Sequence, residues 1–262
     1  MRVIRFDKGD DTYGFGVMED DNDRITVLAE NPLYSPDKIT PTGQILQLED
    51  VRLVAPVIPA SKVVCVGKNY LEHIREFGSA VPDAPILFIK PNTSVIGPGA
   101  PIVLPKWSNH VDHEVELGVV IKHVTKDINP ENWKDYVFGY TIGNDVSARD
   151  AQKADKQWTR AKGFDTACPL GPWITVNPDL DVQNLRIRSE VDGESRQDDT
   201  TANMMHPVGE LVTYISQAMT LLPGDVILTG TPAGVGLVDP GQRVEIDIDA
   251  IGTLANPFVA SE

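Results

Sequence analysis

Cysteine and long apolar runs are both scarce in this chain of 262 residues. Nothing around its two cysteines, Cys65 and Cys168, indicates a disulfide framework, so we expect a reducing compartment. Residues 1–10 lack the apolar core of a signal peptide. No run of about 18 apolar residues, the length of a membrane-spanning helix, occurs anywhere. Together these absences predict a cytoplasmic protein.

Positive charge is also in short supply. The chain has 23 lysine and arginine residues against 38 aspartate and glutamate residues, a formal net charge of −15 and a pI near 4.7. Such a surface repels polyanions, which argues against nucleic acid as a partner. It does not exclude a small anionic substrate, because a bound cation and a few basic side chains can reverse the field locally.

Helical periodicity is limited to two segments, residues 70–77 and 207–221. Short β-like runs separated by turn residues dominate the rest, in keeping with 21 glycines and 20 prolines. The strands predicted in the larger part of the chain are residues 62–67, 86–89, 115–121, 137–142, 173–176, 185–191, 225–229 and 243–248. Many short strands with few helices between them predict a β-rich α+β barrel or roll rather than a doubly wound parallel sheet.

The residue pattern of the sequence changes after residue 58, and this change divides the chain into two parts. Residues 1–58 form a small acidic lobe, with a hairpin predicted through residues 3–6 and 15–17 and a proline-punctuated loop at residues 31–42. A buried strand then begins a larger domain of residues 59–262. The hydrophobic content of 41% and the mean hydropathy of −0.16 are those of a globular protein with a real core.

Two glutamates, Glu114 and Glu116, are separated by one valine inside a segment that is otherwise suited to burial. Because side chains alternate faces along a strand, both carboxylates project from the same side. Two buried anions on one face repel each other and lose hydration unless a positive group compensates them. A hard divalent cation is the simplest compensation, so the pair predicts a metal site. A solvent-facing stripe on an edge strand is the alternative.

A third carboxylate, Asp145, stands at a tight turn after the next predicted strand and could converge on the pair. Three carboxylates with water or substrate oxygens suit Mg²⁺ or Mn²⁺, whereas zinc prefers histidine and cysteine. Locally, an Asx turn or a helix N-cap explains Asp145 equally well. His110 and His113 form an H-x-x-H beside the pair, but on a strand this spacing places them on opposite faces, which argues against zinc.

His73 and Glu76 stand three residues apart in the first predicted helix, so their side chains can meet on one helix face. A carboxylate that is hydrogen-bonded to one imidazole nitrogen orients the ring and raises its basicity. A general base requires this arrangement. The alternative is a surface histidine with an ordinary neighbour.

Three further side chains are candidates for contact with an anionic substrate. Lys90 and Lys162 are cations among apolar neighbours that could bind a carboxylate or an enolate oxygen, or could be ordinary surface lysines. Thr231 lies in the glycine-rich segment 229–236, which lacks the Lys-Ser/Thr pair of a phosphate-binding loop. We interpret this segment as a loop that brings backbone N–H groups and Thr231 close to a small ligand. A plain turn is the alternative.

Six motifs occur in order along the chain. They are Gly67-Lys-Asn-Tyr-Leu-Glu-His73, Pro85-Ile-Leu-Phe-Ile-Lys-Pro91, His113-Glu-Val-Glu-Leu-Gly118, Gly143-Asn-Asp-Val-Ser-Ala-Arg-Asp150, Ala161-Lys-Gly-Phe164 and Leu222-Pro-Gly-Asp-Val-Ile-Leu-Thr-Gly-Thr-Pro232. This ordered set resembles the fumarylacetoacetate hydrolase family. The likeness is to its small single-chain members: acylpyruvases, oxaloacetate decarboxylases, fumarylpyruvate hydrolases, and isomerase/decarboxylases of homoprotocatechuate breakdown. It covers the chain from about residue 62 onward, and the first lobe matches only loosely.

The resemblance implies a mixed β-sandwich roll, barrel-like in outline and usually dimeric. It implies Mg²⁺ or Mn²⁺ held by Glu114, Glu116 and Asp145. By position, His73 and Glu76 match the family's catalytic dyad, which is carried on a lid that orders when substrate binds.

Further matches are residue by residue. Lys162 matches the family's active-site lysine, Gln152 the glutamine that positions water or substrate, and Thr231 the contact to the substrate carboxylate. Two departures accompany them. Residues 64–67 offer no further carboxylate ligand before the dyad, which argues against fumarylacetoacetase itself, and Gly163 follows the lysine where serine is frequent.

The implied chemistry is cleavage of the C3–C4 bond of a small 2-oxo acid through a pyruvate enolate, which the cation and Lys162 stabilise. We expect an oxaloacetate decarboxylase with acylpyruvate hydrolase activity, acting as a homodimer without nucleic acid or membrane partners. The alternatives within the enzymes are a 2-hydroxyhepta-2,4-diene-1,7-dioate isomerase/decarboxylase and a fumarylpyruvate hydrolase of aromatic catabolism. The alternative outside them is a metal-binding β-roll without turnover.

Overall fold

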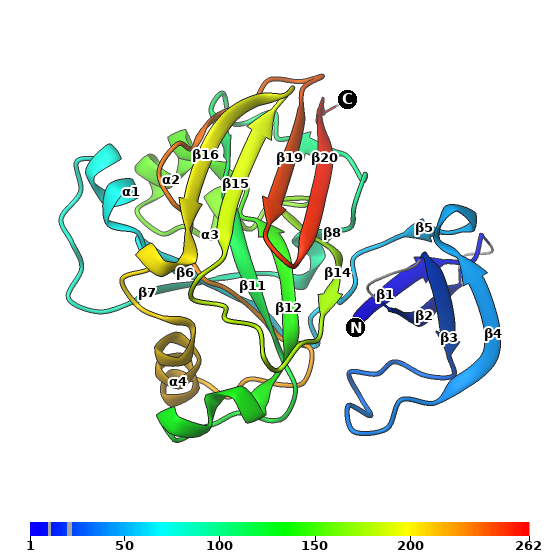
Figure 1. Ribbon diagram of the computed structural model, residues 1–262. Coiled ribbons are helices and arrows are strands. Elements are labelled where there is room, and N and C mark those ends of the chain that lie inside the picture. The colour runs from blue at the N-terminus through cyan, green and yellow to red at the C-terminus, as the bar shows by residue number, and fades with distance from the viewer. Residues whose placement is uncertain (10–11, 20–22, 262) are drawn as a thin grey trace.

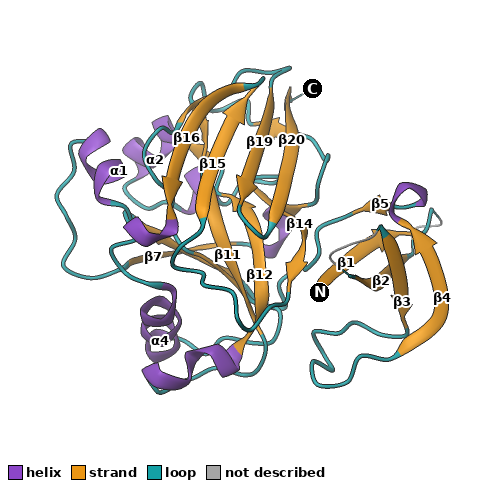
Figure 2. Cartoon of the chain, in the orientation of Figure 1, coloured by secondary structure: helices purple, strands orange, loops and turns teal. Residues whose placement is uncertain are grey.

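The computed structural model describes residues 1–9, 12–19 and 23–261 and is built mainly of strands (Figure 2). The strands are β1 (Arg2–Asp7), β2 (Tyr13–Met18), β3 (Arg24–Leu28), β4 (Pro41–Gln47), β5 (Arg52–Leu53), β6 (Val63–Gly67), β7 (Ile86–Lys90), β8 (Val95–Ile96), β9 (Ile102–Leu104), β10 (Val111–His113), β11 (Val115–Ile121), β12 (Val137–Asn144), β13 (Ser147–Ala148), β14 (Cys168–Thr175), β15 (Arg186–Val191), β16 (Glu194–Thr200), β17 (Val226–Leu228), β18 (Gly236–Leu237), β19 (Arg243–Ile248) and β20 (Gly252–Ala260). The α-helices are α1 (Leu71–Glu76), α2 (Arg149–Asp155), α3 (Thr159–Lys162) and α4 (Val208–Ala218). The predicted β-rich α+β class is confirmed.

The longest sheet runs through both parts of the chain. Its strand order is β4-β3-β2-β1-β14-β12-β11-β17-β6-β7, with β5 paired to β1 and β8 paired to β14. Figure 1 shows the blue strands β1–β4 set to one side of the larger body. Strand β1 joins the two, because Arg2 and Val3 pair with Thr175 and Ile174 of β14. Within the described residues, no pairing connects the end strands β4 and β7, so this sheet is open rather than a closed barrel.

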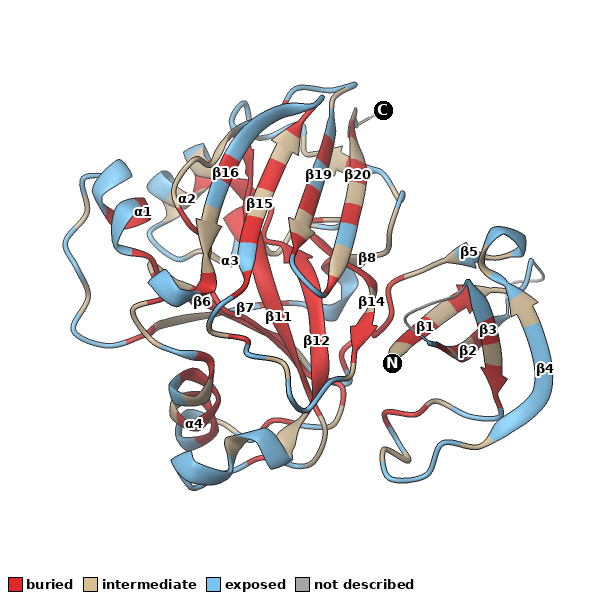
Figure 3. Cartoon of the chain, viewed as in Figure 1, coloured by how far each residue is buried: buried red, intermediate tan, exposed pale blue. Residues whose placement is uncertain are grey.

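A second sheet, ordered β16-β15-β19-β20-β9, lies against the first. Contacts of β11 with β15, and of β12 with β19 and β20, hold the two layers together. The main apolar core lies between them and includes Leu117 and Ile121 of β11 and Ile246 of β19. Figure 3 shows β11 and β12 buried along their length, whereas β16 is mostly exposed. Strand β11 is therefore enclosed on both faces, and of the glutamate pair Glu114 directly precedes it and Glu116 is its second residue.

Helices cover the ends of this sandwich. Helix α4 buries Val208, Leu211, Val212 and Ile215, which confirms the apolar face predicted for the second helix. Helix α1 confirms the first, one residue shorter at each end than predicted. Helices α2 and α3, which follow Asp145 in the sequence, were not predicted. No helix in the described part of the chain is long and apolar enough to cross a membrane.

The predicted strands are found with small shifts at their ends. The hairpin of the first lobe is confirmed as β1 and β2, which pair in antiparallel register. The strand expected at residues 173–176 begins earlier, at Cys168, and ends at Thr175. Several strands were missed, β3, β4, β9 and β10 among them. The longest of the others are β16, which polar residues fill, and β20, where Asn256 and Pro257 interrupt the apolar pattern.

Candidate active site

One cavity of about 380 Å³ collects most of the predicted site residues. It lies where the ends of β6, β7 and β11 meet α1 and α2. The residues that line it are Val66, Gly67, Lys68, His73, Ile74, Phe77, Ser79, Phe88, Glu114, Glu116, Asp145, Arg149, Gln152, Lys153, Trp158, Lys162 and Thr231. Charged groups therefore share the cavity with an aromatic wall.

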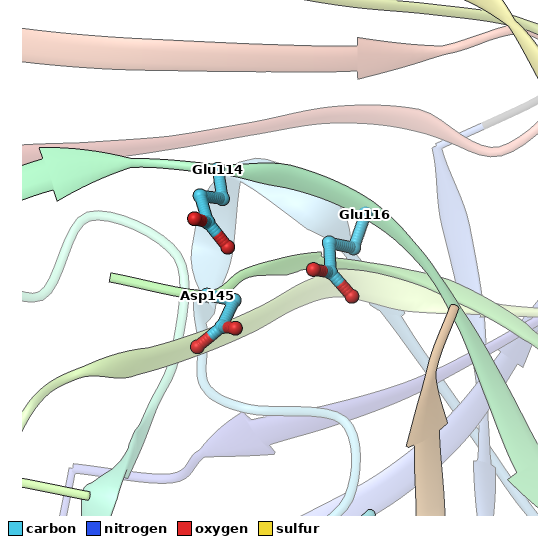
Figure 4. A group of neighbouring side chains, drawn as sticks. All are labelled: Glu114, Glu116 and Asp145. Atoms are coloured by element: carbon cyan, nitrogen blue, oxygen red, sulfur yellow. The ribbon is translucent and has the colours of Figure 1, made fainter. Parts of the chain in front are cut away.

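The three predicted carboxylates converge at this cavity. Glu114 precedes β11, Glu116 lies within it, and Asp145 directly follows the neighbouring strand β12. The backbone N–H of Asp145 donates to the carbonyl of Glu114 at 3.0 Å, so sheet pairing itself brings them together. One carboxylate oxygen from each residue lies within 4.8 Å of the others, and all three side chains are buried. Figure 4 shows the three carboxylates gathered in one space between the strands.

Glu116 is the least compensated of the three. Its carboxylate accepts a hydrogen bond from the backbone N–H of Gly230 at 2.8 Å. No salt bridge to it is found among the described residues. Burial raises the pKa of Glu116 well above its usual range, and the charges of Asp145 and Glu114 raise it further. Glu116 therefore has less positive charge close to it than Glu114 or Asp145 has.

Glu114 has the opposite environment. Lys162 donates to its Oε2 at 2.8 Å, and a guanidinium nitrogen of Arg149 donates to its Oε1. Burial alone would raise the pKa of this carboxyl, but the charges of Lys162 and Arg149 outweigh burial and hold the pKa well below its usual range. Glu114 is therefore an anion at every working pH.

The two predicted lysines approach Asp145 from different sides. Lys162 Nζ donates to Asp145 Oδ2 at 2.7 Å, and Lys90 Nζ donates to Oδ1 at 2.6 Å and to the carbonyl of Val146 at 3.3 Å. Burial would lower the pKa of Lys162, yet Asp145 and Glu114 together raise it, so the ammonium stays charged. Lys162 lines the cavity, whereas Lys90 is fully buried behind Asp145. The predicted contact of Lys90 with substrate stays a prediction.

The donor set fits a hard divalent cation. The three converging side chains offer oxygen ligands only, as Mg²⁺ and Mn²⁺ prefer, and no histidine or cysteine joins the cluster. The raised pKa of Glu116 shows a negative charge that the described side chains leave uncompensated. Glu114, Glu116 and Asp145 could therefore hold such an ion.

The predicted dyad forms at the edge of the same cavity. His73 Nδ1 lies 3.2 Å from Glu76 Oε2, and Glu76 Oε1 accepts a hydrogen bond from the backbone N–H of Gly234 at 3.1 Å. Burial lowers the pKa of His73, although the charge of Glu114 acts in the other direction. The imidazole is therefore neutral near pH 7 and can accept a proton, while Glu76 orients it.

Gln152 and Thr231 also line the cavity. Gln152 Oε1 accepts a hydrogen bond from Arg149 Nη1 at 3.0 Å, which leaves its amide N–H groups for other partners. Thr231 follows Gly230, whose N–H is bound to Glu116, and its Oγ1 accepts a hydrogen bond from Gln197 at 2.7 Å. The structure thus places both at the cavity wall, and their contact with substrate stays a prediction.

Arg149 is a site residue that we did not predict from the sequence. Besides Glu114 and Gln152, its guanidinium binds Asp112 through Nε at 2.7 Å and lies 4.9 Å from the ring centre of Phe77. It therefore connects the carboxylates, the glutamine and the end of α1. The available signal was its position at the start of a helix, three residues before Gln152, on the same helix face.

Two of the doubts raised by the sequence can be addressed in the structure. A Cβ atom at Gly163 would lie 2.6 Å from the carbonyl oxygen of Thr159, so this close turn requires glycine after Lys162. His113 is buried away from the carboxylates, with its ring nitrogens 2.9 Å from Ser189 Oγ and 3.2 Å from the carbonyl of Gly236. His110 binds Asp112 instead, at 3.0 Å. The H-x-x-H is no part of the carboxylate cluster.

The fold is an open β-sandwich, and its buried cluster of three carboxylates, with a His–Glu pair and a lysine beside it, could hold a metal ion. Comparison with known proteins gives the family. The family model described as fumarylacetoacetate (FAA) hydrolase C-terminal matches residues 62–259, and one described as Rv2993c-like, N-terminal matches residues 1–56. The chain belongs to the fumarylacetoacetate hydrolase family.

Individual relatives carry several activities in their names. The chain is 52% identical to protein Rv2993c of Mycobacterium tuberculosis over 88% of this chain and 86% of that protein. It is 42% identical to the mitochondrial oxaloacetate tautomerase fahd2 of Xenopus laevis, over 88% and 76%.

Solved structures of relatives share the fold. A 2-hydroxyhepta-2,4-diene-1,7-dioate isomerase from Mycobacterium marinum superposes with a TM-score of 0.90 at 47% identity, over 100% of this chain and 99% of that one. A fumarylpyruvate hydrolase from Pseudomonas aeruginosa, in complex with Mn²⁺ and pyruvate, has a TM-score of 0.73 at 31% identity, over 79% and 98%. These relatives establish the fold and the family but carry different reaction names.

Proposed function

We propose that this protein is a Mg²⁺- or Mn²⁺-dependent enzyme that cleaves the C3–C4 bond of a small 2-oxo acid, with the enolate of pyruvate as the intermediate. Oxaloacetate decarboxylation and acylpyruvate hydrolysis are the reactions proposed. A homodimer, as the family resemblance implies, remains part of this proposal. The observation that supports it most is the convergence of Glu114, Glu116 and Asp145 with His73 and Lys162 in one cavity.

A divalent cation at the carboxylate cluster would polarise the carboxylate and keto oxygens of a 2-oxo acid and stabilise negative charge that develops on them. Lys162 can add to this effect. An ammonium group has three N–H donors, and two of them are bound to Glu114 and Asp145. The third is left for a substrate oxygen, where it would favour the enolate over the ketone.

The group on C4 decides which bond-breaking step follows. If C4 is a ketone, neutral His73 can take a proton from water while the water oxygen attacks C4. The C3–C4 bond then breaks, and its electron pair forms the pyruvate enolate beside a carboxylic acid. If C4 is a carboxylate, CO₂ leaves with cleavage of the same bond, and protonation of the enolate at C3 gives pyruvate.

Tautomerisation is a second candidate, and the environment of His73 favours it. A neutral imidazole could remove a proton from C3 of oxaloacetate, and protonation of the resulting enolate at the C2 oxygen gives the enol without breaking a C–C bond. Relatives at 42% and 43% identity are named oxaloacetate tautomerases. Tautomerisation passes through the enolate of oxaloacetate itself, whereas decarboxylation gives the enolate of pyruvate, and Lys162 could stabilise either one.

Isomerisation of a longer dicarboxylic acid is also supported by one feature of the cavity. One water takes up about 30 Å³ in the liquid, so a cavity of about 380 Å³ has room for many such volumes and for more than a four-carbon acid. Phe88 and Trp158 form an edge-to-face pair with ring centres 5.2 Å apart, a wall suited to an unsaturated chain. Lys68 and Lys153 line the same cavity and could meet a second carboxylate.

One set of assays separates these reactions. Purified protein with Mn²⁺ is incubated with oxaloacetate, acetylpyruvate and fumarylpyruvate, and pyruvate release is measured together with the ultraviolet absorbance of the enol. Glu116→Ala is the inactive variant, and Glu131→Ala, an exposed glutamate, is the matched control.

Pyruvate release that disappears in Glu116→Ala and persists in Glu131→Ala supports the proposal. Faster keto–enol exchange of oxaloacetate without pyruvate would instead identify a tautomerase. Absence of both with all three acids would contradict enolate chemistry on these substrates.

A further inference from the structure

A buried glutamine outside the predicted site connects Thr231 with the carboxylate cluster. Gln197 is the one fully buried residue of β16, whose other residues are exposed or half-buried. Its side-chain amide makes hydrogen bonds through both the oxygen and the nitrogen, two at each. A primary amide can donate two hydrogen bonds and accept two, and Gln197 makes all four. Such complete pairing is unusual on a polar outer strand.

The oxygen of this amide faces the strand that carries the glutamates. Gln197 Oε1 accepts a hydrogen bond from the backbone N–H of Val115 at 3.0 Å and one from Ser189 Oγ at 3.1 Å. Val115 stands between Glu114 and Glu116 in the sequence. The position of the glutamine is therefore tied to the backbone from which both carboxylates project.

The nitrogen of the same amide faces the glycine-rich loop. Gln197 Nε2 donates to Thr231 Oγ1 at 2.7 Å and to the carbonyl of Pro232 at 2.8 Å. A backbone N–H can only donate and a backbone carbonyl can only accept. Val115 and Pro232 together thus fix which end of the amide is oxygen and which is nitrogen, and leave no freedom for a flip.

This orientation determines what the hydroxyl of Thr231 can do. Because Nε2 is a donor, Oγ1 of Thr231 must accept from it, and the hydroxyl proton has to go elsewhere. The described residues include no acceptor for that proton, and Thr231 lines the cavity. The hydroxyl is therefore offered to the cavity as a donor, which suits an acceptor oxygen such as that of a carboxylate.

The loop itself is seated directly on β16. Gly234 has a φ of +98°, and a Cβ atom at this position would overlap the carbonyl oxygen of Arg196, the neighbour of Gln197. At its other end the loop binds Glu116 through the N–H of Gly230 at 2.8 Å. Thr231 lies between these two attachments, so its place relative to the carboxylates is fixed at both sides.

We propose that Gln197 is a positioning residue of this site. It holds the hydroxyl of Thr231 as a hydrogen-bond donor toward a ligand carboxylate, at a fixed place relative to the carboxylate cluster. The inference deepens the proposed function and relies on it only for the ligand, a 2-oxo acid. Pyruvate is the probe, because it carries the carboxylate and keto group of that class.

The test measures the Kd of pyruvate by calorimetry in the presence of Mn²⁺ for four variants. Gln197→Glu keeps the shape but removes both N–H donors, so the Thr231 proton turns toward the new carboxylate. Gln197→Met removes the hydrogen bonds without adding a charge, in case the first variant folds poorly. We expect about tenfold weaker binding for each, since one hydrogen bond to a charged group is lost. Thr231→Val should show the same loss, and Thr231→Ser should restore affinity.

The decisive measurement is the double variant Gln197→Met with Thr231→Val. If the glutamine acts through the threonine, the double variant binds about as weakly as Thr231→Val alone, roughly tenfold below the wild type. A merely structural role would make the two losses multiply to about a hundredfold. Gln217→Met, at an exposed glutamine of α4, is the matched control and should bind as the wild type does.

Steady-state kinetics with oxaloacetate separate this inference from the proposed function. We expect Gln197→Met to raise KM more than it lowers kcat, because it acts on the carboxylate contact. If the wild type binds pyruvate but releases none from any substrate, the proposed function fails while the binding cycle still decides the role of Gln197. Multiplying losses, or a wild type that does not bind pyruvate, would overturn the inference.

Discussion

Two of the buried carboxylates, Asp225 and Glu116, have opposite environments. Asp225, just before β17, accepts hydrogen bonds from the backbone N–H groups of Ser61, Lys62 and Leu222 at 2.9–3.1 Å, and from Ser61 Oγ and Lys62 Nζ at 2.8 Å. Burial would raise the pKa of Asp225, but these bonds bring it below the usual value. Glu116 has one backbone N–H and two neighbouring anions, and its pKa is raised.

If the proposed function holds, the difference separates a structural carboxylate, Asp225, from a metal-binding one, Glu116. At Asp225 the protein supplies every donor, so nothing is left for a ligand. At Glu116 the fold brings anions together and supplies too little positive charge, which leaves a place for an ion from solution. Burial alone does not distinguish the two residues; the count of donors does.

The largest expected effect that tests this contrast is on catalysis. Glu116→Gln removes one ligand and should reduce kcat/KM by about 10³-fold or more, because metal assistance contributes several kcal/mol. Without metal, the Glu116→Gln variant should unfold at the same temperature as the metal-free wild type or at a higher one, since a repulsive charge is removed. Activity within tenfold of the wild type would show that Glu116 is no ligand.

Asp225→Asn should act on stability instead. Breaking a buried ion pair and its hydrogen bonds should lower the free energy of unfolding by about 3 kcal/mol or more, while kcat at a temperature well below unfolding stays unchanged. Urea unfolding measures the first quantity and pyruvate release the second. Asp249→Asn, at an exposed aspartate, is the control and should change neither. A large loss of kcat in folded Asp225→Asn would break the contrast.

Added Mn²⁺ should stabilise the protein only through the carboxylate cluster. At a concentration of 100 times its Kd, an ion that binds the folded state alone contributes about 2.7 kcal/mol, which calorimetry or a thermal melt detects. The shift should vanish in Glu116→Gln and persist in Asp225→Asn. An equal shift in both variants would place the ion elsewhere.

The smallest effect is on pH dependence, and here the two sites have opposite signs. The folded pKa of Asp225 is lowered, so its contribution is present above its usual value of 3.8 and is lost as the pH falls through the folded pKa. The folded pKa of Glu116 is raised, so metal-free protein loses stability as the pH rises above 4.5 toward that pKa.

Urea unfolding in EDTA between about pH 3 and 8 measures both slopes. Asp225→Asn should flatten the acid limb, and Glu116→Gln should remove the decline above pH 4.5. Identical pH profiles for the two variants and the wild type would contradict the assigned pKa directions.

Much of the site could be predicted from the sequence, because its residues stand at short, regular spacings or within a series of motifs in a fixed order. The i, i+2 spacing of Glu114 and Glu116 directly predicts a shared face on a strand. The i, i+3 spacing of His73 and Glu76 predicts their contact on a helix. Asp145 is different, because its approach to the pair depends on the pairing of β11 with β12; its place after a strand made it a candidate, and the family resemblance gave it the role of a ligand.

The parts that were missed depend on tertiary contacts. Strand β16, Glu194–Thr200, is polar along its length and carries no alternating apolar pattern, so neither the strand nor the burial of Gln197 could be anticipated. The sequence around Arg149 is typical of an exposed helix start. Arg149 is buried because its guanidinium binds Asp112 and Glu114, which come from other parts of the fold. Such residues are defined by partners that lie far away in the sequence.

The loop from Gly230 to Gly234 has a consequence for how new substrate preferences could evolve on this fold. Its backbone N–H groups bind Glu116 at one end and Glu76 at the other, so an insertion there would disturb the ion site and the dyad together. Phe88 lies 5.2 Å from the Lys162 ammonium, whereas no hydrogen bond of the Trp158 side chain is found among the described residues. A substitution at Trp158 would therefore reshape the cavity wall while both contacts of the loop stay in place.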